Sequence, residues 1–225
     1  MAAAVQALAR IPAIERLVLV GDEDVLRQEL AKHNVAPSDR LHLFHTTQVI
    51  EMTDGAVEAV RRKKDSSLNR AIDLLKEGAV DAAVSAGHTG ALVASSTIKL
   101  RNLPGVDRAG IATLMPTRNG KFLLLDAGAS VDAKPLHLLT YAIMGSVYCQ
   151  NILHIPNPKV GLLCNGTEEV KGNELTKEAF QLLKNAPINF IGNVEGHGLF
   201  EGQVDVVVCD GFIGNIVFKN RRKPG

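Results

Sequence analysis

The chain has 225 residues, of which 46% are hydrophobic and 22% are charged, and its formal net charge is +1. This length and composition are typical of a soluble protein with a substantial core. Aromatic residues make up only 4% and Trp is absent, so surfaces that stack single-stranded bases are not expected. The nearly neutral charge also gives no general attraction to polyanions. These features disfavour a nucleic-acid-binding protein.

The cysteines and the first residues indicate the compartment. Cys149, Cys164 and Cys209 are odd in number, lie far apart and have apolar neighbours, which favours reduced core thiols over disulfides or a zinc site. The mildly apolar segment Met1–Leu17 is interrupted by charged residues and a proline, so it fits neither a secretory leader nor a membrane-spanning helix. We expect a cytosolic protein in which any membrane contact is peripheral.

Apolar runs bounded by turn residues alternate with helical patterns, which predicts βα units around a mainly parallel sheet. The chain opens with a predicted helix at Ala3–Arg10. The next predicted elements are, in chain order, a strand at Leu17–Val20, a helix at Asp22–His33, a strand at Leu41–Phe44, a helix at Ser67–Lys76, a strand at Ala82–Ser85 and a helix at Thr89–Leu100.

The second half adds an antiparallel pair, because Asn119-Gly120 separates two apolar runs and is the usual signal for a tight hairpin. The predicted elements are strands at Ile111–Met115 and Phe122–Leu125, a helix at Pro135–Asn151, a strand at Val160–Cys164, a helix at Glu174–Asn185, a strand at Ile188–Ile191, and a strand at Val204–Cys209 followed by the start of a helix up to Phe218. The sheet is therefore expected to be mixed.

The predicted organisation is one α/β domain over residues 1–219, followed by a frayed tail at 220–225. The turn at Pro104–Arg108 would mark a boundary if there are two domains. The first helix has no strand before it and the last has hardly begun when the sequence stops. Since a parallel sheet needs its flanking elements, we expect a fragment that lacks an opening strand and later helices.

Five short glycine-bearing loops each follow an apolar, strand-like run. In an open α/β sheet such loops meet at one edge, where glycines let the backbone approach a ligand and amides hold an anion. The sequence therefore predicts a site for something phosphorylated, built from the loops Ser85–Gly90, Asp126–Ala129, Asn165–Gly172, Asn193–Gly198 and Asp210–Gly214.

The first loop, Ser85–Gly90, joins an apolar run to a helix. Its backbone amides and the hydroxyls of Ser85 and Thr89 would cradle phosphate at the helix start. It is neither a dinucleotide fingerprint nor a Walker A loop. A plain tight turn with Thr89 as the helix N-cap explains the pattern equally well, and His88 alone indicates little.

A basic run, Arg61-Arg62-Lys63-Lys64, precedes a helix that Asp65 or Ser66 would cap. It would draw an acidic ligand or partner toward the helix start. The simpler interpretation, which the pattern favours, is the solvated last turn of a preceding helix. The same run would also suit a nucleic-acid or membrane-surface module, which would bind random polyanions in a salt-sensitive way.

The second loop contains Asp126, Gly128 and Lys134. Asp126 would orient a lysine or accept a proton, and Lys134, at a Pro-started helix, would contact phosphate. The alternative is that Asp132 simply caps this helix.

Lys171 and Asn173 lie between glycines and a helix start, where amides and the helix dipole also point. They are candidates to bind an anion or an oxyanion, although a polar surface loop with Asn173 as N-cap is as consistent with the pattern. Asp210 and Gly211 repeat the strand-loop-helix arrangement. The seven histidines are scattered, and neither a metal site nor a Ser-His-Asp arrangement is expected.

Taken together, five segments resemble the bacterial phosphate acyltransferases of phospholipid synthesis over about Leu17–Lys219. They are Arg61 to Ser67, the Ser85-Ala86-Gly87-His88-Thr89-Gly90-Ala91-Leu92 motif, Lys171-Gly172-Asn173-Glu174-Leu175, Gly192-Asn193-Val194-Glu195-Gly196, and Asp205 to Phe212. Five motifs in the right order are far more specific than any one of them.

The resemblance implies that an acyl group passes from acyl carrier protein to inorganic phosphate, giving an acyl phosphate that a membrane glycerol-phosphate acyltransferase consumes. It implies a three-layer α/β/α fold like that of the isopropylmalate dehydrogenases and phosphate acetyltransferases, a homodimer and loose membrane attachment. No cofactor is needed. The alternatives are a coenzyme A-dependent phosphotransacylase and an impaired fragment that only binds a ligand or partner.

The resemblance also suggests residue roles. Phosphate would be held by Ser85, Gly87, Thr89 and Gly90, with His88 standing where the family usually has asparagine. Lys171 and Asn173 would meet the oxyanion or phosphate charge. Asp126, Asp210 and Asn215 would orient these groups, and Gly128, Lys134, Gly211 and Asn215 would bind substrate. The acidic carrier protein would be met by Arg61, Arg62, Lys63 and Lys64.

Overall fold

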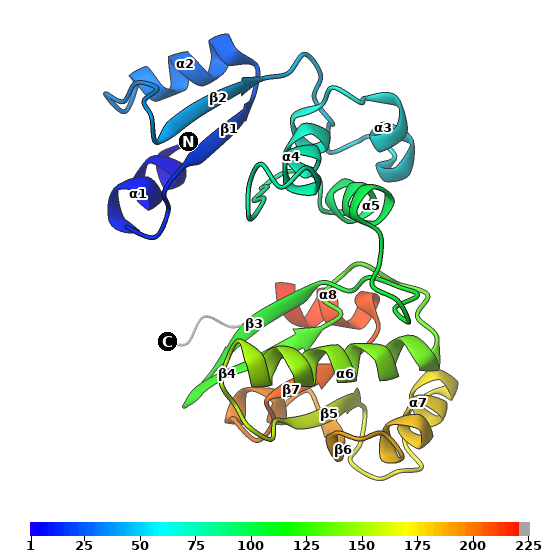
Figure 1. Cartoon of the computed structure of the whole chain (residues 1–225). Coiled ribbons are helices and arrows are strands. Elements are labelled where there is room, and N and C mark those ends of the chain that lie inside the picture. The colour runs from blue at the N-terminus through cyan, green and yellow to red at the C-terminus, as the bar shows by residue number, and fades with distance from the viewer. Residues whose placement is uncertain (221–225) are drawn as a thin grey trace. The chain divides into compact units, whose positions relative to one another are not determined.

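A computed structural model describes residues 1–220 of the chain. They belong to two compact units, Met1–Arg101 and Asn102–Gly225 (Figure 1). The division falls just before the Pro104–Arg108 turn. Within the described residues, no helix has the length and apolar character needed to cross a membrane. Apart from Asn220, the tail predicted at 220–225 lies outside the described residues.

The first unit begins with a small two-stranded sheet. It contains α1 (Ala2–Arg10), β1 (Leu17–Gly21), α2 (Glu23–Ala31) and β2 (Leu41–His45). The strands are parallel, with Leu17 opposite Leu41, and α2 contacts both. Asp22 caps α2, because its carboxylate accepts a hydrogen bond from the Val25 amide at 3.0 Å. All four elements agree with the sequence-based prediction.

Three helices complete this unit: α3 (Ala56–Arg62), α4 (Ser67–Lys76) and α5 (Thr89–Leu100). They pack around Val60, Leu68 and Ala91. A buried carboxamide, Asn69 of α4, joins them, since its Nδ2 donates to the carbonyls of Val60 and Lys63 and its Oδ1 accepts from Ser95. This polar core fixes the end of α3 against α5.

The prediction of a strand at Ala82–Ser85 is wrong. The segment forms no strand, and Val84 is 95% exposed. An apolar run becomes a strand only where a neighbour pairs with its backbone and a core covers its side chains. In the described part of this unit the sheet ends with β1 and β2.

The second unit is built on a five-stranded sheet with the order β3-β4-β7-β5-β6. Its elements are β3 (Ala112–Thr117), β4 (Gly120–Leu125), α6 (Pro135–Asn151), β5 (Lys159–Cys164), α7 (Glu174–Lys184), β6 (Asn189–Glu195), the 3₁₀ helix η1 (Gly198–Glu201), β7 (Val206–Val208) and α8 (Gly211–Lys219). Strands β3 and β4 form the predicted antiparallel hairpin. The other pairings are parallel, so the sheet is mixed, as predicted.

Helices cover both faces of this sheet (Figure 1). On one face α6 and α7 pack on residues such as Leu125 and Val208. On the other, η1 and the end of α8 pack on residues such as Leu124 and Val207. Successive strand residues alternate between these two cores, as the pleat requires. The predicted α/β fold with a mostly parallel, helix-flanked sheet is confirmed.

All three cysteines are free. Cys149 and Cys209 are buried in the second unit, whereas Cys164 is half-buried at the end of β5. Burial raises the pKa of the Cys149 thiol to about 11, and it also raises the pKa of Cys209. Because the thiolate is the reactive form, the two buried thiols behave as core residues.

Candidate functional site

The predicted site residues of the second unit gather at one edge of its sheet. Strands β4, β7, β5 and β6 are adjacent and parallel, so the loops that follow them leave from the same edge. Those loops and the helix starts after them carry Asp126, Gly128, Lys134, Lys171, Asn173, Asp210, Gly211 and Asn215.

Asp126 is fully buried directly after β4. Its Oδ1 accepts hydrogen bonds from the amides of Ile111, Gly128 and Ala129 at 2.9–3.0 Å, and its Oδ2 accepts one from the Ser130 amide at 2.8 Å. Charge-assisted bonds of this kind are strong. No described lysine is bonded to this carboxylate, so its contacts are those of an anchor that shapes the loop.

The start of α8 packs directly on this loop. The Gly211 amide donates to the Ser130 carbonyl at 2.7 Å. A Cβ placed on Gly211 would lie 2.7 Å from Asp126 Oδ2, and one on Gly214 would collide with the Asp126 carbonyl oxygen. Gly128, with a φ of +136°, lies against Asn215, whose Cβ would be 3.5 Å from a Cβ at this position. A Cβ has no room at Gly211 or Gly214, whereas at Gly128 it is the positive φ that favours glycine.

Asp132 does not cap α6, contrary to the alternative considered above. Its carboxylate pairs with Arg108 Nη2 at 2.7 Å, while Arg108 Nε donates to the Ser130 hydroxyl. The N-cap residue is Lys134, whose amide donates to Nδ1 of His137 at 3.0 Å. The Lys134 side chain has no polar partner among the described residues, so its ammonium group stays exposed at the sheet edge.

Asn173 is the N-cap of α7, as one interpretation of the sequence predicted, and its Oδ1 accepts from the Thr176 amide at 2.9 Å. Asp210 likewise caps α8 by accepting from the amides of Phe212 and Ile213, both at 2.9 Å. The Oδ1 atoms of Asn173 and Asp210 are therefore already engaged by their own helices. In contrast, the Lys171 side chain is exposed and has no polar partner in the described part of the chain.

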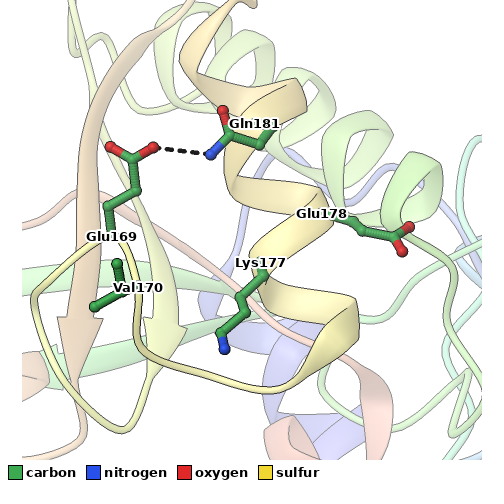
Figure 2. Close-up of a pocket in the computed structure, with 5 residues that line it drawn as sticks. All are labelled: Glu169, Val170, Lys177, Glu178 and Gln181. Atoms are coloured by element: carbon green, nitrogen blue, oxygen red, sulfur yellow. Dashed lines mark hydrogen bonds between the residues drawn. The ribbon is translucent and has the colours of Figure 1, made fainter.

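The loop before α7 borders a surface hollow of about 410 Å³ (Figure 2). The lining residues are Glu169, Val170, Lys177, Glu178 and Gln181. Figure 2 shows Glu169 reaching across to Gln181, and this hydrogen bond measures 2.8 Å. None of the predicted phosphate ligands lines the hollow, so we do not assign the anion to it.

In the first unit, the Ser85–Gly90 loop is mostly exposed. The prediction that Thr89 caps α5 is wrong, because His88 is the N-cap and its Nδ1 accepts from the Ala91 amide at 3.2 Å. The opposite ring nitrogen, Nε2, is 3.1 Å from the Asp54 carbonyl, so Nε2 carries the proton. A histidine can thus provide the acceptor that an Asn cap provides, while also tying the loop to residue 54.

The basic run falls at the end of α3, as the simpler interpretation predicted. Arg62 pairs with Glu58 within the helix. Lys63 is bound to Asp54 at 2.6 Å and to the Val49 carbonyl at 2.8 Å, and the hydrogen bond from Lys63 lowers the pKa of Asp54. Arg61 and Lys64 are exposed, and no described residue pairs with them. They are the cations available to a partner.

The predicted residues thus form two groups, one in each unit, at the start of α5 and at the carboxyl edge of the five-stranded sheet. Sequence reasoning did not assign roles to Arg108, Ser130, Glu169 or Asn193, which hold the loops in shape. Asn193 lay in a glycine loop, but nothing in the pattern linked it to Glu168. Among residues 1–220, no three His, Cys, Asp or Glu side chains gather as a metal site would require.

Comparison with known proteins decides the family. The sequence profile described as "Fatty acid synthesis protein" matches residues 1–223. The chain belongs to the fatty acid synthesis protein family. The resemblance seen in the five motifs is therefore confirmed at the level of the family.

Curated relatives in this family carry a more specific name. The "Phosphate acyltransferase" of Geobacter sulfurreducens is 51% identical over 203 residues, which are 90% of this chain and 58% of that protein. The protein of the same name from Thermoanaerobacterium thermosaccharolyticum is 50% identical over 204 residues, 91% of this chain and 60% of that protein. The chain thus spans less than two thirds of the length of these relatives.

Solved structures support the fold assigned to this member of the fatty acid synthesis protein family. A phosphotransacetylase from Streptococcus pyogenes matches with a TM-score of 0.69 at 18% identity, covering 96% of this chain and 76% of that one. A branched-chain phosphotransacylase from Enterococcus faecalis matches with a TM-score of 0.55 at 15% identity, covering 90% and 81%. At these identities the likeness concerns the fold alone.

Proposed function

We propose that this chain carries the catalytic surface of a phosphate acyltransferase, which moves a fatty acyl group from acyl carrier protein to inorganic phosphate. The product is an acyl phosphate for phospholipid synthesis, to be consumed by a membrane glycerol-phosphate acyltransferase. Relatives that are 51% identical in sequence and are named phosphate acyltransferases support this proposal. The five motifs in the expected order support it too.

The reaction needs positioning and charge stabilisation. A phosphate oxygen attacks the thioester carbonyl carbon and forms a C–O bond, and the carbonyl oxygen becomes an oxyanion. The C–S bond then breaks and the carrier's sulfur leaves as a thiolate. A site for this chemistry must hold two anionic groups close together and supply donors to the oxyanion.

The observation that carries the proposal is the arrangement at the carboxyl edge of the five-stranded sheet. Two exposed lysines, Lys134 and Lys171, follow β4 and β5, and both strands pair with β7. The loops around them are shaped by buried hydrogen bonds at Asp126 and Asn193. In this proposal the ammonium groups of the two lysines bind the negative charge of the phosphate or the oxyanion. Asp126, Asp210 and Asn173 act indirectly, through the backbone that they hold.

The first unit has its own set of donors suited to an anion, at the start of α5. Its first amides point out of a 12-residue helix, and His88 accepts from that of Ala91, which leaves the amides of Thr89 and Gly90 as donors. The Ser85 hydroxyl already orients the Gly87 amide at 3.2 Å. The acidic carrier protein would bind to Arg61 and Lys64, the two cations of the basic run that have no ion-pair partner among the described residues.

The proposal includes a homodimer with peripheral membrane attachment. Helix α6 exposes Leu136, Ile143 and Val147 although its opposite face is in the core. A helix that is apolar all round is normally covered on both sides. A second copy of the chain would supply that cover.

A coenzyme A-dependent phosphotransacylase is the second candidate, because proteins named phosphotransacetylases share this fold. The chemistry at the carbonyl is the same, and the two differ in the thiol that leaves. A preference for acyl carrier protein over coenzyme A therefore separates them.

The test is a trapping assay. The chain is incubated with acyl-acyl carrier protein and phosphate, acyl phosphate is captured by hydroxylamine as a hydroxamate, and the freed carrier thiol is counted. The Geobacter sulfurreducens relative, at its full length, serves as the positive control. We expect phosphate-dependent hydroxamate with the carrier protein, and a loss with Lys171→Met that the matched surface variant Lys121→Met does not show.

Equal or greater turnover of acyl-coenzyme A would select the second candidate. Binding of phosphate or carrier protein without any hydroxamate, under conditions where the relative is active, would mean that this chain only binds its ligands.

A further inference from the structure

We infer that Asn193 is a positioning residue, whose side-chain amide holds the turn at residues 168–171 so that Lys171 stands at the sheet edge. The inference rests on the proposed function for its catalytic meaning. Its structural content can be tested without it.

The contact is buried and specific. Asn193 is only 7% exposed and lies on β6 opposite Leu162 of β5. Its Nδ2 donates to the Glu168 carbonyl at 2.9 Å, and the Lys171 amide donates to the same oxygen at 3.0 Å. One carbonyl thus connects the neighbouring strand to the backbone of Lys171.

The outer side of the turn is held by a different set of groups. Glu169 accepts from Gln181 Nε2 at 2.8 Å and from Lys184 Nζ at 3.2 Å, both on α7 (Figure 2 shows the first). These hydrogen bonds, that of Gln181 first, lower the pKa of Glu169. A Cβ on Gly166 would come within 2.7 Å of Lys171 Cγ. The stem of Lys171 therefore packs on its own loop and directs the ammonium group outward.

Asn193 also has an acceptor to which no described residue donates. In the described part of the chain its Oδ1 is the buried side-chain atom without a hydrogen-bond partner. An unpaired buried polar atom costs about 1–3 kcal/mol, and an apolar side chain of similar shape would avoid that cost. Stability alone does not explain an amide here. An amide is explained if its hydrogen bond to the Glu168 carbonyl is needed to hold the turn.

Loss of this bond should displace Lys171 without removing it. Misplacement of a contacting group by about 1 Å can cost roughly 100-fold in rate. We expect Asn193→Leu to lower kcat/KM for phosphate by about 10- to 100-fold, with a raised KM for phosphate and an unchanged KM for the acyl donor. A variant that only lost part of its folded population would lower kcat alone.

The second measurement is tryptic cleavage after Lys171, followed by mass spectrometry. The matched control is Asn189→Ala, which removes a similar bond at the other end of β6, from Asn189 Nδ2 to the Asn157 carbonyl at 3.2 Å. Cleavage should accelerate several-fold in Asn193→Leu, stay at the wild-type rate in Asn189→Ala, and return toward it in Asn193→Gln, which keeps the donor. Asn193→Ser, which is too short to reach Glu168, replaces Asn193→Leu if the latter does not fold.

Wild-type cleavage and wild-type kinetics in a folded Asn193→Leu or Asn193→Ser protein would overturn the inference. If the wild-type chain forms no acyl phosphate, the proposed function fails, but the cleavage rates still decide whether Asn193 holds the turn. If the chain is active and cleavage is unchanged, the positioning role fails alone.

Discussion

Gly211 and Asp126 are in such close contact that a single Cβ on Gly211 would lie 2.7 Å from Asp126 Oδ2 and equally close to the Ser130 amide nitrogen. The loop after β4 and the start of α8 are therefore built as one piece. The side chain that shapes the loop is accommodated only because the neighbouring helix begins with glycine.

We expect Gly211→Ala to destabilise the second unit by about 1–3 kcal/mol, because the methyl group meets backbone and a buried carboxylate that cannot move aside. The control is Gly198→Ala, where a Cβ would meet nothing within 4 Å. Urea unfolding followed by tyrosine fluorescence reports on this unit, because both tyrosines of the chain, Tyr141 and Tyr148, lie on α6. Equal urea midpoints for Gly211→Ala and Gly198→Ala would show that the loop after β4 can move to accommodate the methyl group.

Asp126→Asn should act through loop shape. The amide can keep the three bonds to Oδ1, but its NH₂ group would face the Ser130 amide, which now donates to Oδ2. Two opposed donors in a buried site cost about 1–3 kcal/mol. We expect lower stability and lower activity, with an unchanged shape of the activity–pH profile. Loss of one limb of that profile would instead mean that Asp126 transfers a proton.

Arg61 and Lys64, with which no described residue pairs, give a test of partner binding. Arg61→Glu with Lys64→Glu should raise KM for the acyl carrier protein substrate about 10-fold, corresponding to about 1.4 kcal/mol, and leave KM for phosphate unchanged. Lys121→Glu, which reverses an exposed charge on β4, is the control. If KM for the acyl carrier protein substrate rose equally in the Arg61→Glu/Lys64→Glu variant and in Lys121→Glu, the cause would be a general charge effect and not a docking surface.

Acid should weaken the first unit through Asp65. Hydrogen bonds from Thr47 and Arg70 lower its pKa in the folded state. A carboxylate of this kind contributes stability above its unfolded pKa of about 3.9, and that contribution is lost as the pH falls through the folded value. Asp65→Asn should therefore be less stable than the wild type at about pH 6, and the difference should shrink at lower pH.

Urea midpoints from far-UV circular dichroism, measured at several pH values, check this expectation. Asp81→Asn, at an exposed position with no polar partner among the described residues, is the matched control. A difference between Asp65→Asn and the wild type that stays constant as the pH falls would contradict the assignment.

Much of the fold could be predicted because its signals are local. Asn119-Gly120 indicated the hairpin, and the ranges of α4, α5 and α6 follow from apolar spacing and helix-start residues. The error at Ala82–Ser85 has the opposite origin, since an apolar run is a strand only if another strand lies beside it. That information is not in the run itself.

The site was predictable as a set of loops and not as a set of contacts. Glycine-bearing turns after strands identified the sheet edge where Lys134 and Lys171 stand. The sequence did not show that the carboxylate of Asp126 accepts hydrogen bonds from four backbone amides, or that His88 and not Thr89 caps α5. Such choices depend on which donors are left unpaired after packing, and so on residues distant in the sequence such as Ile111.

The position of β7 in the sheet has a consequence for how the second unit forms. Residues 206–208 pair with β4 on one side and β5 on the other, yet they are translated after both. Until this short segment is in place, the β3–β4 hairpin and the β5–β6 pair each present an open backbone edge, at β4 and at β5. An unpaired strand edge can pair with another chain, so a form of the second unit without β7 would be prone to aggregate, and insertion of β7 covers both edges together.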